Sequence, residues 1–391
     1  MAVSVEVRDT NLISKGPLTW TKVDLTTRYN RVGAWSITIP DTPTNRVLAN
    51  IPDLGVVVDW NGVFTFTGFL ENWNPVKSID ATTGAFVDTL VLSGADDLGV
   101  VANRLAYPNP AVVWTSQTAA GSDLQTGHCE TVIKHFVNLN AGPGALTARR
   151  SPHLTIAADS ARGSTVSYAA RFAAGVDLTL MNIIRLLVAT GGPLGVSVVQ
   201  SGANLVFDCY VPRDLSQTAW FSPDLGNLRT YNLSVSTPAA TNALVRGSTT
   251  FTEVTGTDAT NGWRHTEVLV DQSGSTDATQ ITQAGTDAIA QGTGATHLQL
   301  QAVDLPQLAF GVHYGLGDRV TVEIQPGVSY TEIVTAVQLV ADASSGTAYT
   351  ETVTPTIGAA ESDIGSDKTA TALLAAEVRA IRKALQRLQV F

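Results

Sequence analysis

The sequence predicts a mainly β protein with an α+β insert and a C-terminal coiled-coil helix. Apolar and polar residues alternate in short runs near both ends of the chain, as in half-buried strands. Two stretches in the middle carry apolar residues at helical spacing, and the last residues carry a heptad pattern. We therefore expect five parts: a first β domain at 1–103, an α+β insert at 104–220, a second β domain at 221–357, a linker at 358–370 and a helix at 371–391.

The first β domain is predicted from alternation and from one turn. Two runs alternate apolar with polar residues: Val3, Val5 and Val7, then Trp35, Ile37 and Ile39. One face of each strand should therefore lie in a core. Over 55–70, Asn61-Gly62 separates two β-branched and aromatic runs, which is typical of a type I′ hairpin. A further strand is expected over 86–92, followed by a turn at Asp96-Asp97.

Helical stripes predict the insert. Residues 130–138 place apolar side chains on one helical face, and so do residues 177–189. Asp177 is placed as N-cap or first-turn acid of the second helix, and Gly191-Gly192-Pro193 should end it. The stretch 196–211 then indicates a hairpin turning at 202–204.

Many short strands with Gly-rich turns return in the second β domain, which favours a barrel or a sandwich. A helix over 280–291 interrupts them. The strand candidates are 231–236, 243–247, 265–270, 298–302, 319–324 and 332–340. Residues 358–369 have no apolar period and are expected to be a polar linker.

The tail is expected to be an oligomerisation helix. Its apolar residues are spaced 4, 3, 4 and 3, the seam of a heptad pattern: Leu374, Val378, Ile381, Leu385 and Leu388. A helix with one apolar stripe, placed after a linker, has no core of its own chain to meet. We expect it to pack on copies of itself or on a partner helix; the alternative is a helix folded back onto the second β domain.

Composition restricts the class of partner. The net charge is −10, which argues against a nucleic-acid backbone or an anionic membrane as the main partner. Charged residues make up only 15%, so we expect the surface to be covered by other proteins. Residues 371–391 differ, with four basic residues against one acidic. The chain shows no signal peptide and no stretch long enough to span a bilayer, so we expect a protein made in a cytoplasm with no membrane anchor.

A search for chemistry finds no P-loop, no GxSxG, no HExxH and no cysteine cluster for zinc. Cys129 and Cys209 are expected to be buried thiols. Cys129 with His128 or His135 is a weak candidate for a thiol nucleophile; a small helix with a buried thiol is favoured. We therefore predict no enzyme, no cofactor and no metal site.

Three polar clusters have alternative interpretations. Asp96-Asp97 is either a carboxylate pair or, as favoured, a turn or helix cap. The run 271–277 resembles a calcium loop loosely but lacks its acidic density, so a polar turn is preferred. Arg149-Arg150 either binds a partner carboxylate or stays solvated.

Seven tryptophans leave a glycan-binding module open as the alternative function. Trp35 and Trp60 fall in strand patterns and should be core. Trp73 and Trp263 lie near turns, where an exposed ring could form a platform for a sugar.

The order of segments over residues 1–360 resembles the baseplate-hub proteins at the tail tip of long-tailed bacteriophages, in the compact type common in phages of actinobacteria. None of these segments is a catalytic motif, and their order carries the resemblance. They are 5–12, 31–40, 55–70, 145–154, 220–232, 242–247, 314–324 and 354–358.

This resemblance implies two related hub-type β-barrel domains, a homotrimer that adapts a six-fold tail tube to three-fold tip components, and closure of the tube. It also implies contacts with a distal tail ring protein, a tape-measure protein and tail fibre or spike proteins, within a virion assembled in the host cytoplasm. Genomic DNA would pass transiently through an acidic lumen. Asp318, in the turn 315–318, should cap that turn; the alternative is a contact with a neighbouring chain.

Overall fold

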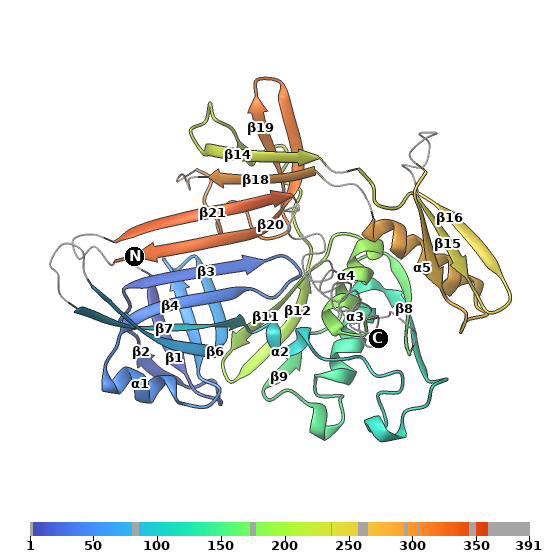
Figure 1. Ribbon diagram of the computed structural model, residues 1–391, viewed down its shortest axis with the longest axis horizontal. Coiled ribbons are helices and arrows are strands. Elements are labelled where there is room, and N and C mark those ends of the chain that lie inside the picture. The colour runs from blue at the N-terminus through green and yellow to red at the C-terminus, as the bar shows by residue number, and fades with distance from the viewer. Residues whose placement is uncertain are drawn as a thin grey trace, which may run out of the picture.

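The computed structural model describes residues 3–79, 86–172, 177–235, 237–256, 265–292, 296–302, 305, 307–343 and 349–358. Strands dominate these ranges, so the prediction of a mainly β protein is confirmed. Figure 1 shows a β body at one end, a mixed helical and β region beside it, and a small sheet with one helix at the far end.

The body is one large sheet. Among the described residues it has 13 strands, in the order β14-β18-β21-β20-β3-β4-β7-β6-β5-β1-β2, with β19 joined to β20 and β13 to β19. The first-region strands are β1 (Ser4–Arg8), β2 (Ser14–Pro17), β3 (Lys22–Arg28), β4 (Ala34–Pro40), β5 (Gly55–Trp60), β6 (Phe64–Ile79) and β7 (Phe86–Asp96). The others are β13 (Trp220–Phe221), β14 (Leu228–Val235), β18 (Thr296–Ala302), β19 (Arg319–Gln325), β20 (Val328–Asp342) and β21 (Thr350–Gly358). Helix α1 (Pro43–Ala49) lies between β4 and β5.

Strand β20 joins the two β regions. Its first half pairs with β19, and its residues Ala336–Asp342 pair with Lys22–Arg28 of β3. One hydrophobic core accordingly holds Val23 and Ile37 together with Val337 and Ile357. Separate barrels were expected, but no pairing among the described residues joins β14 to β2 into a closed barrel. The physical reason is the length of β20, which lets it belong to both regions.

A second core fills the insert. Its apolar residues run from Leu98 to Cys209. Its elements are α2 (Gly99–Ala102), β8 (Ser122–His128), α3 (Cys129–Asn140), β9 (Leu154–Ile156), β10 (Thr165–Arg171), α4 (Leu180–Gly191), β11 (Gly195–Ser201) and β12 (Asn204–Tyr210). Both predicted helices and the predicted hairpin are present. Helix α4 begins later than expected: Thr179 is its N-cap residue, and Asp177 instead accepts a hydrogen bond from the Thr179 N–H.

A small third unit lies within the second β region. Its strands β16 (Phe251–Thr255), β15 (Asn242–Arg246) and β17 (Glu267–Asp271) form a separate sheet, and α5 (Ala278–Gln291) covers one face. Gly285 allows this close packing, because a Cβ there would lie 2.5 Å from the Val254 side chain. Composition alone did not separate this unit from the rest of the second β domain.

The β5–β6 hairpin turns where predicted but with a longer loop. Trp60 pairs with Phe64, which leaves the three residues 61–63 in the turn. Asn61 and Gly62 both have positive φ, at 59° and 73°, as the Asn-Gly pair is suited to adopt.

Candidate assembly surfaces

The candidate nucleophile is inert. Cys129 is buried at the start of α3, and its thiol donates a hydrogen bond to the Leu187 carbonyl. Burial raises the pKa of this thiol to about 12, so it carries no thiolate at neutral pH. His128 bonds the Gly163 carbonyl through Nδ1, and His135 pairs with Asp123 at 3.0 Å. The preferred interpretation, a helix with a buried thiol, is confirmed.

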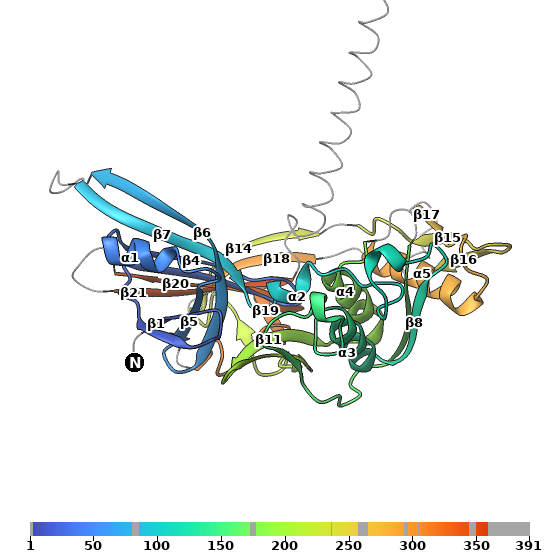
Figure 2. The same cartoon turned by 90° about the horizontal axis from the view of Figure 1, so that it is seen from below.

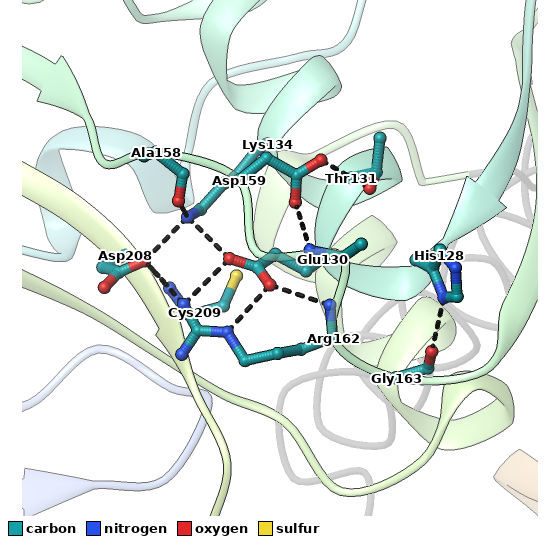
Figure 3. A network of polar contacts seen from close by, with 11 residues as sticks. His128, Glu130, Thr131, Lys134, Ala158, Asp159, Arg162, Gly163, Asp208 and Cys209 are labelled. Carbon is teal, nitrogen blue, oxygen red and sulfur yellow. Dashed lines mark hydrogen bonds and ion pairs between the residues drawn. The ribbon is translucent and has the colours of Figure 1, made fainter.

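Next to Cys209 lies a network of four charged side chains, Glu130, Lys134, Arg162 and Asp208 (Figure 3). Glu130, whose side chain is fully buried, binds the Arg162 guanidinium at 2.8 Å and Lys134 Nζ at 2.7 Å. The same Lys134 Nζ lies 2.7 Å from Asp208 Oδ1 on β12. Burial alone would raise the pKa of Glu130, but the hydrogen bonds from Arg162 and Lys134 outweigh it and lower the pKa to about 2.

This network has a structural role. Every group in it already holds an opposite charge, so none is left as a base or a nucleophile. It joins α3 to β12 and to the chain around Arg162. Across the described residues, no group of three His, Cys, Asp or Glu side chains could hold a metal ion.

The predicted Asp96-Asp97 pair splits between two roles. Asp97 is buried and forms an ion pair with Arg8 of β1, and it also accepts a hydrogen bond from Thr67. Asp96 accepts a hydrogen bond from the Gly33 N–H, and burial raises its pKa to about 6. The predicted turn is present at Asp97, before α2, while Asp96 is the last residue of β7. Nothing in the local sequence indicated Arg8 as a partner of Asp97.

These residues belong to the junction between body and insert. Arg8 also bonds Gln200 of β11, and Asn30 bonds both the Leu194 carbonyl and the Val196 N–H. A cavity of about 380 Å³ lies beside this junction between body and insert. So many direct hydrogen bonds hold the insert at a fixed orientation on the body.

Asp318 makes two contacts near the start of β19. It accepts a hydrogen bond from the Gly315 N–H at 2.8 Å, so the predicted capping role in the turn is confirmed. It also binds the Arg213 guanidinium at 2.6 Å, within the same chain. The carboxylate is therefore satisfied without a neighbouring copy.

The arginine pair and the calcium-like run are also engaged within the chain. Arg149 lies 3.5 Å from the centre of the Tyr107 ring and donates to Asn140, while Arg150 donates to the Ala145 carbonyl. Arg149 is thus engaged within the chain, while Arg150 stays exposed, as the solvated alternative expected for it; the contact with a partner carboxylate stays a prediction. Asp271 accepts a hydrogen bond from the Ser273 N–H, which is the favoured polar turn.

One exposed part of the body is the β6–β7 arm, defined as residues 71–79 and 86–89. Beyond Leu70, β6 pairs only with β7, and Figure 2 shows both strands extending past α1. Trp73 is 37% exposed and Phe86 is 67% exposed. A two-stranded ribbon is marginal in water by itself, so the arm has the properties of a contact surface.

The two edges of the large sheet differ. At one edge, β2 is four residues long and contains Lys15 and Pro17, features that discourage strand addition. At the other edge, β14 has eight residues, no proline and a single charge, Arg229. An edge of this kind accepts a further strand more readily.

Several predicted residues lie outside the described residues. These are Trp263, the linker after Gly358 and all five seam residues, Leu374, Val378, Ile381, Leu385 and Leu388. Among the helices that are described, none is both long and apolar enough to cross a membrane.

Residues 4–359 match the model of the family described as Siphovirus ReqiPepy6 Gp37-like protein. The chain belongs to this family. The predicted resemblance to phage tail-tip baseplate proteins is confirmed by this match and by the structures below. No curated protein matches the chain.

Solved phage tail proteins have a similar fold. The 43 kDa tail protein of prophage MuSo2 from Shewanella oneidensis has 13% identity and a TM-score of 0.52, with 93% of this chain and 99% of that chain covered. Prophage tail protein gp18 from Listeria monocytogenes has 13% identity and a TM-score of 0.50, with 97% and 99% covered. A tail protein from Neisseria meningitidis has 12% identity and a TM-score of 0.51, with 91% and 97% covered.

Proposed function

We propose that the chain is the structural baseplate hub of a phage tail tip. In this role a homotrimer adapts the six-fold tail tube to three-fold tip components and closes the tube, with each copy contributing its continuous β body. The observation that carries the proposal is the family match over residues 4–359, combined with a fold shared end to end with phage tail proteins.

The tail supplies the trimer contact in this proposal. Leu374, Val378, Ile381, Leu385 and Leu388 form the seam of a three-stranded coiled coil on the three-fold axis. Support comes from the heptad spacing and from its position after the last body strand, β21.

The partners follow from the same role. A distal tail ring protein, the tape-measure protein and tail fibre or spike proteins contact the hub in the virion, and genomic DNA passes through its acidic lumen. The exposed β6–β7 arm supports the existence of such contacts.

Light scattering on the purified chain, with and without residues 371–391, tests the proposal. The full-length chain should have three times the mass of one copy, and removal of the tail should weaken the trimer. A stable full-length monomer at micromolar concentration would contradict the trimeric hub.

One observation favours the alternative of a glycan-binding virion module. Trp114 is 55% exposed and stands edge-on to Phe172, with ring centres 5.5 Å apart. It is a better platform than Trp73, which lies in the arm at 37% exposure. Replacing Trp114 with Ala should abolish binding to host cell-wall glycan if this function is correct, and should change nothing if the chain is only a hub.

A further inference from the structure

The small sheet β16-β15-β17 has an apolar diagonal on its outer face. Leu269 of β17 is 74% exposed and lies directly opposite Leu244 of β15. Phe251 of β16 is 82% exposed and lies opposite Arg246, two residue pairs further along β15 than Leu244. The inner face is different, because Ala243 and Val245 are buried there beneath α5.

Carboxylates border this diagonal. Glu253, Glu267 and Asp271 alternate with partly buried positions on the same strands, so they share the outer face. One arginine, Arg246, lies among them, opposite Asp271. The open face therefore combines a small apolar centre with an acidic border.

Domains are built from two and occasionally three packed layers, and the exposed apolar centre of this sheet can accept a third layer opposite α5. The missing layer that fits is an amphipathic helix whose apolar stripe contacts Phe251, Leu244 and Leu269. Its flanks should be basic, to face the three carboxylates.

The chain itself contains such a segment. Residues 371–391 carry the apolar seam, with Arg379, Arg382, Lys383 and Arg387 against one acid, Glu377. An isolated helix of this length is marginal in water, so it gains stability from any apolar surface it covers.

The connection is long. The last described strand, β21, ends at Gly358, which pairs with His297 at the start of β18. Helix α5 ends at Gln291, a few residues before that pair. Residues 359–370 can span roughly 40 Å when extended, at about 3.5 Å per residue, so the linker gives the tail a wide reach from Gly358.

We propose that in the unassembled chain residues 371–391 dock as an amphipathic helix on the outer face of the β16-β15-β17 sheet. This inference rests on the proposed trimer, because it assigns a regulation to the same seam. The five seam residues can contact either the sheet or two other tails. Docking therefore competes with coil formation and keeps free subunits apart until their local concentration is high.

A disulfide trap tests the docked state. The double variant Leu269→Cys with Leu385→Cys should form an intramolecular disulfide in monomer isolated at low concentration. The native thiols, Cys129 and Cys209, are buried and do not interfere. The matched control is Val47→Cys with Leu385→Cys, because Val47 is 71% exposed on α1, at the opposite end of the molecule (Figure 1). Equal yields of intramolecular disulfide in the two variants would overturn the proposal.

A competition assay separates this inference from the proposed function. Leu269→Glu removes an apolar contact and adds a charge, so the trimer should form about tenfold more tightly, equivalent to about 1.4 kcal/mol. Val47→Glu should leave trimer formation unchanged. If full-length protein trimerises but Leu269→Glu has no effect, the docked state is wrong and the hub stands. If the disulfide forms in a chain that never trimerises, the docking stands and the trimeric hub is wrong.

Discussion

The large body sheet and the small β16-β15-β17 sheet differ in how far their apolar side chains are buried. In the body, central residues such as Leu25, Ile37 and Leu92 are fully buried. In the small sheet, Phe251 and Leu269 stay mostly exposed although they lie in equally regular strands. Both sheets contain the same alternation of apolar and polar residues. The difference teaches that alternation defines which side chains share a face, while the presence of a second layer decides whether that face is closed.

The largest expected effect lies in the body, at its junction with the insert. Asp97→Ala leaves the buried Arg8 guanidinium without its ion-pair partner, so we expect the free energy of unfolding to fall by about 3–5 kcal/mol. Urea denaturation measures this change. The control is Asp41→Ala, whose partner Arg46 is exposed on α1 and whose loss should have a much smaller effect. Similar losses in both variants would mean that the buried pair does not hold the junction.

The next effect is confined to the small sheet. In Gly285→Leu the new side chain meets Val254 and Val245, so we expect a loss of about 1–3 kcal/mol from overpacking. Hydrogen exchange should report faster opening of β15 and β16, with unchanged protection in β3 and β4. Thr286→Leu on the exposed side of α5 is the control and should stay within about 0.5 kcal/mol. Loss of protection throughout the body would show that the two sheets unfold as one unit.

A pH effect of intermediate size compares buried acids in the two regions. Burial raises the pKa of Asp287 on α5 to about 6, against an ordinary value of 3.8, and it does the same for Asp96 in the body. An acid whose folded pKa is raised binds its proton more tightly in the folded state. Stability is therefore greatest below about pH 4 for this group and falls as pH rises towards 6.

Asp287→Asn should remove that part of the fall, and Asp96→Asn should do so independently. The free energy of unfolding, measured in urea between pH 4 and 7, tests both variants. An unchanged slope in Asp287→Asn would mean that this carboxyl group is well solvated at the contact between α5 and the insert.

The smallest effect on stability is expected at the β6–β7 arm. Phe86→Ser should change the free energy of unfolding by less than about 0.5 kcal/mol, because the ring is 67% exposed. Leu90→Ser, four residues along the same strand and fully buried, should destabilise the body severely. If the arm is a contact surface, Phe86→Ser should still reduce incorporation into virions. Normal incorporation of Phe86→Ser into virions would mean that the arm is not a contact surface.

Local patterns predicted most elements. The helices at α3, α4 and α5 and the hairpins at Asn61 and Gly202 follow from short-range spacing and turn chemistry, which depend on neighbouring residues alone. The sheet order could not be predicted in the same way, because the partner of β3 lies in a distant part of the sequence. The separate β15–β17 unit escaped prediction for a related reason: its strands have the same composition as those that join the body.

The candidate surfaces show the same limit. The inert state of Cys129 and the capping role of Asp318 could be anticipated, because each depends on its own helix or turn. The partners Arg8 with Asp97 and Arg213 with Asp318 required the fold, since no spacing rule connects residues on different elements. Exposure of Trp114, Phe251 and Leu269 likewise depends on which face receives a second layer.

The pairing of β3 with β20 has a consequence for the order in which the protein folds during synthesis. Gln338 of β20 donates a hydrogen bond to Asp24 of β3, across 314 positions of sequence. The ribosome therefore completes the insert, whose core closes by Cys209, long before the body receives its joining strand. Throughout that interval β3 offers an open edge, and contacts so distant in sequence form slowly. The nascent chain should be most prone to strand mispairing during this interval.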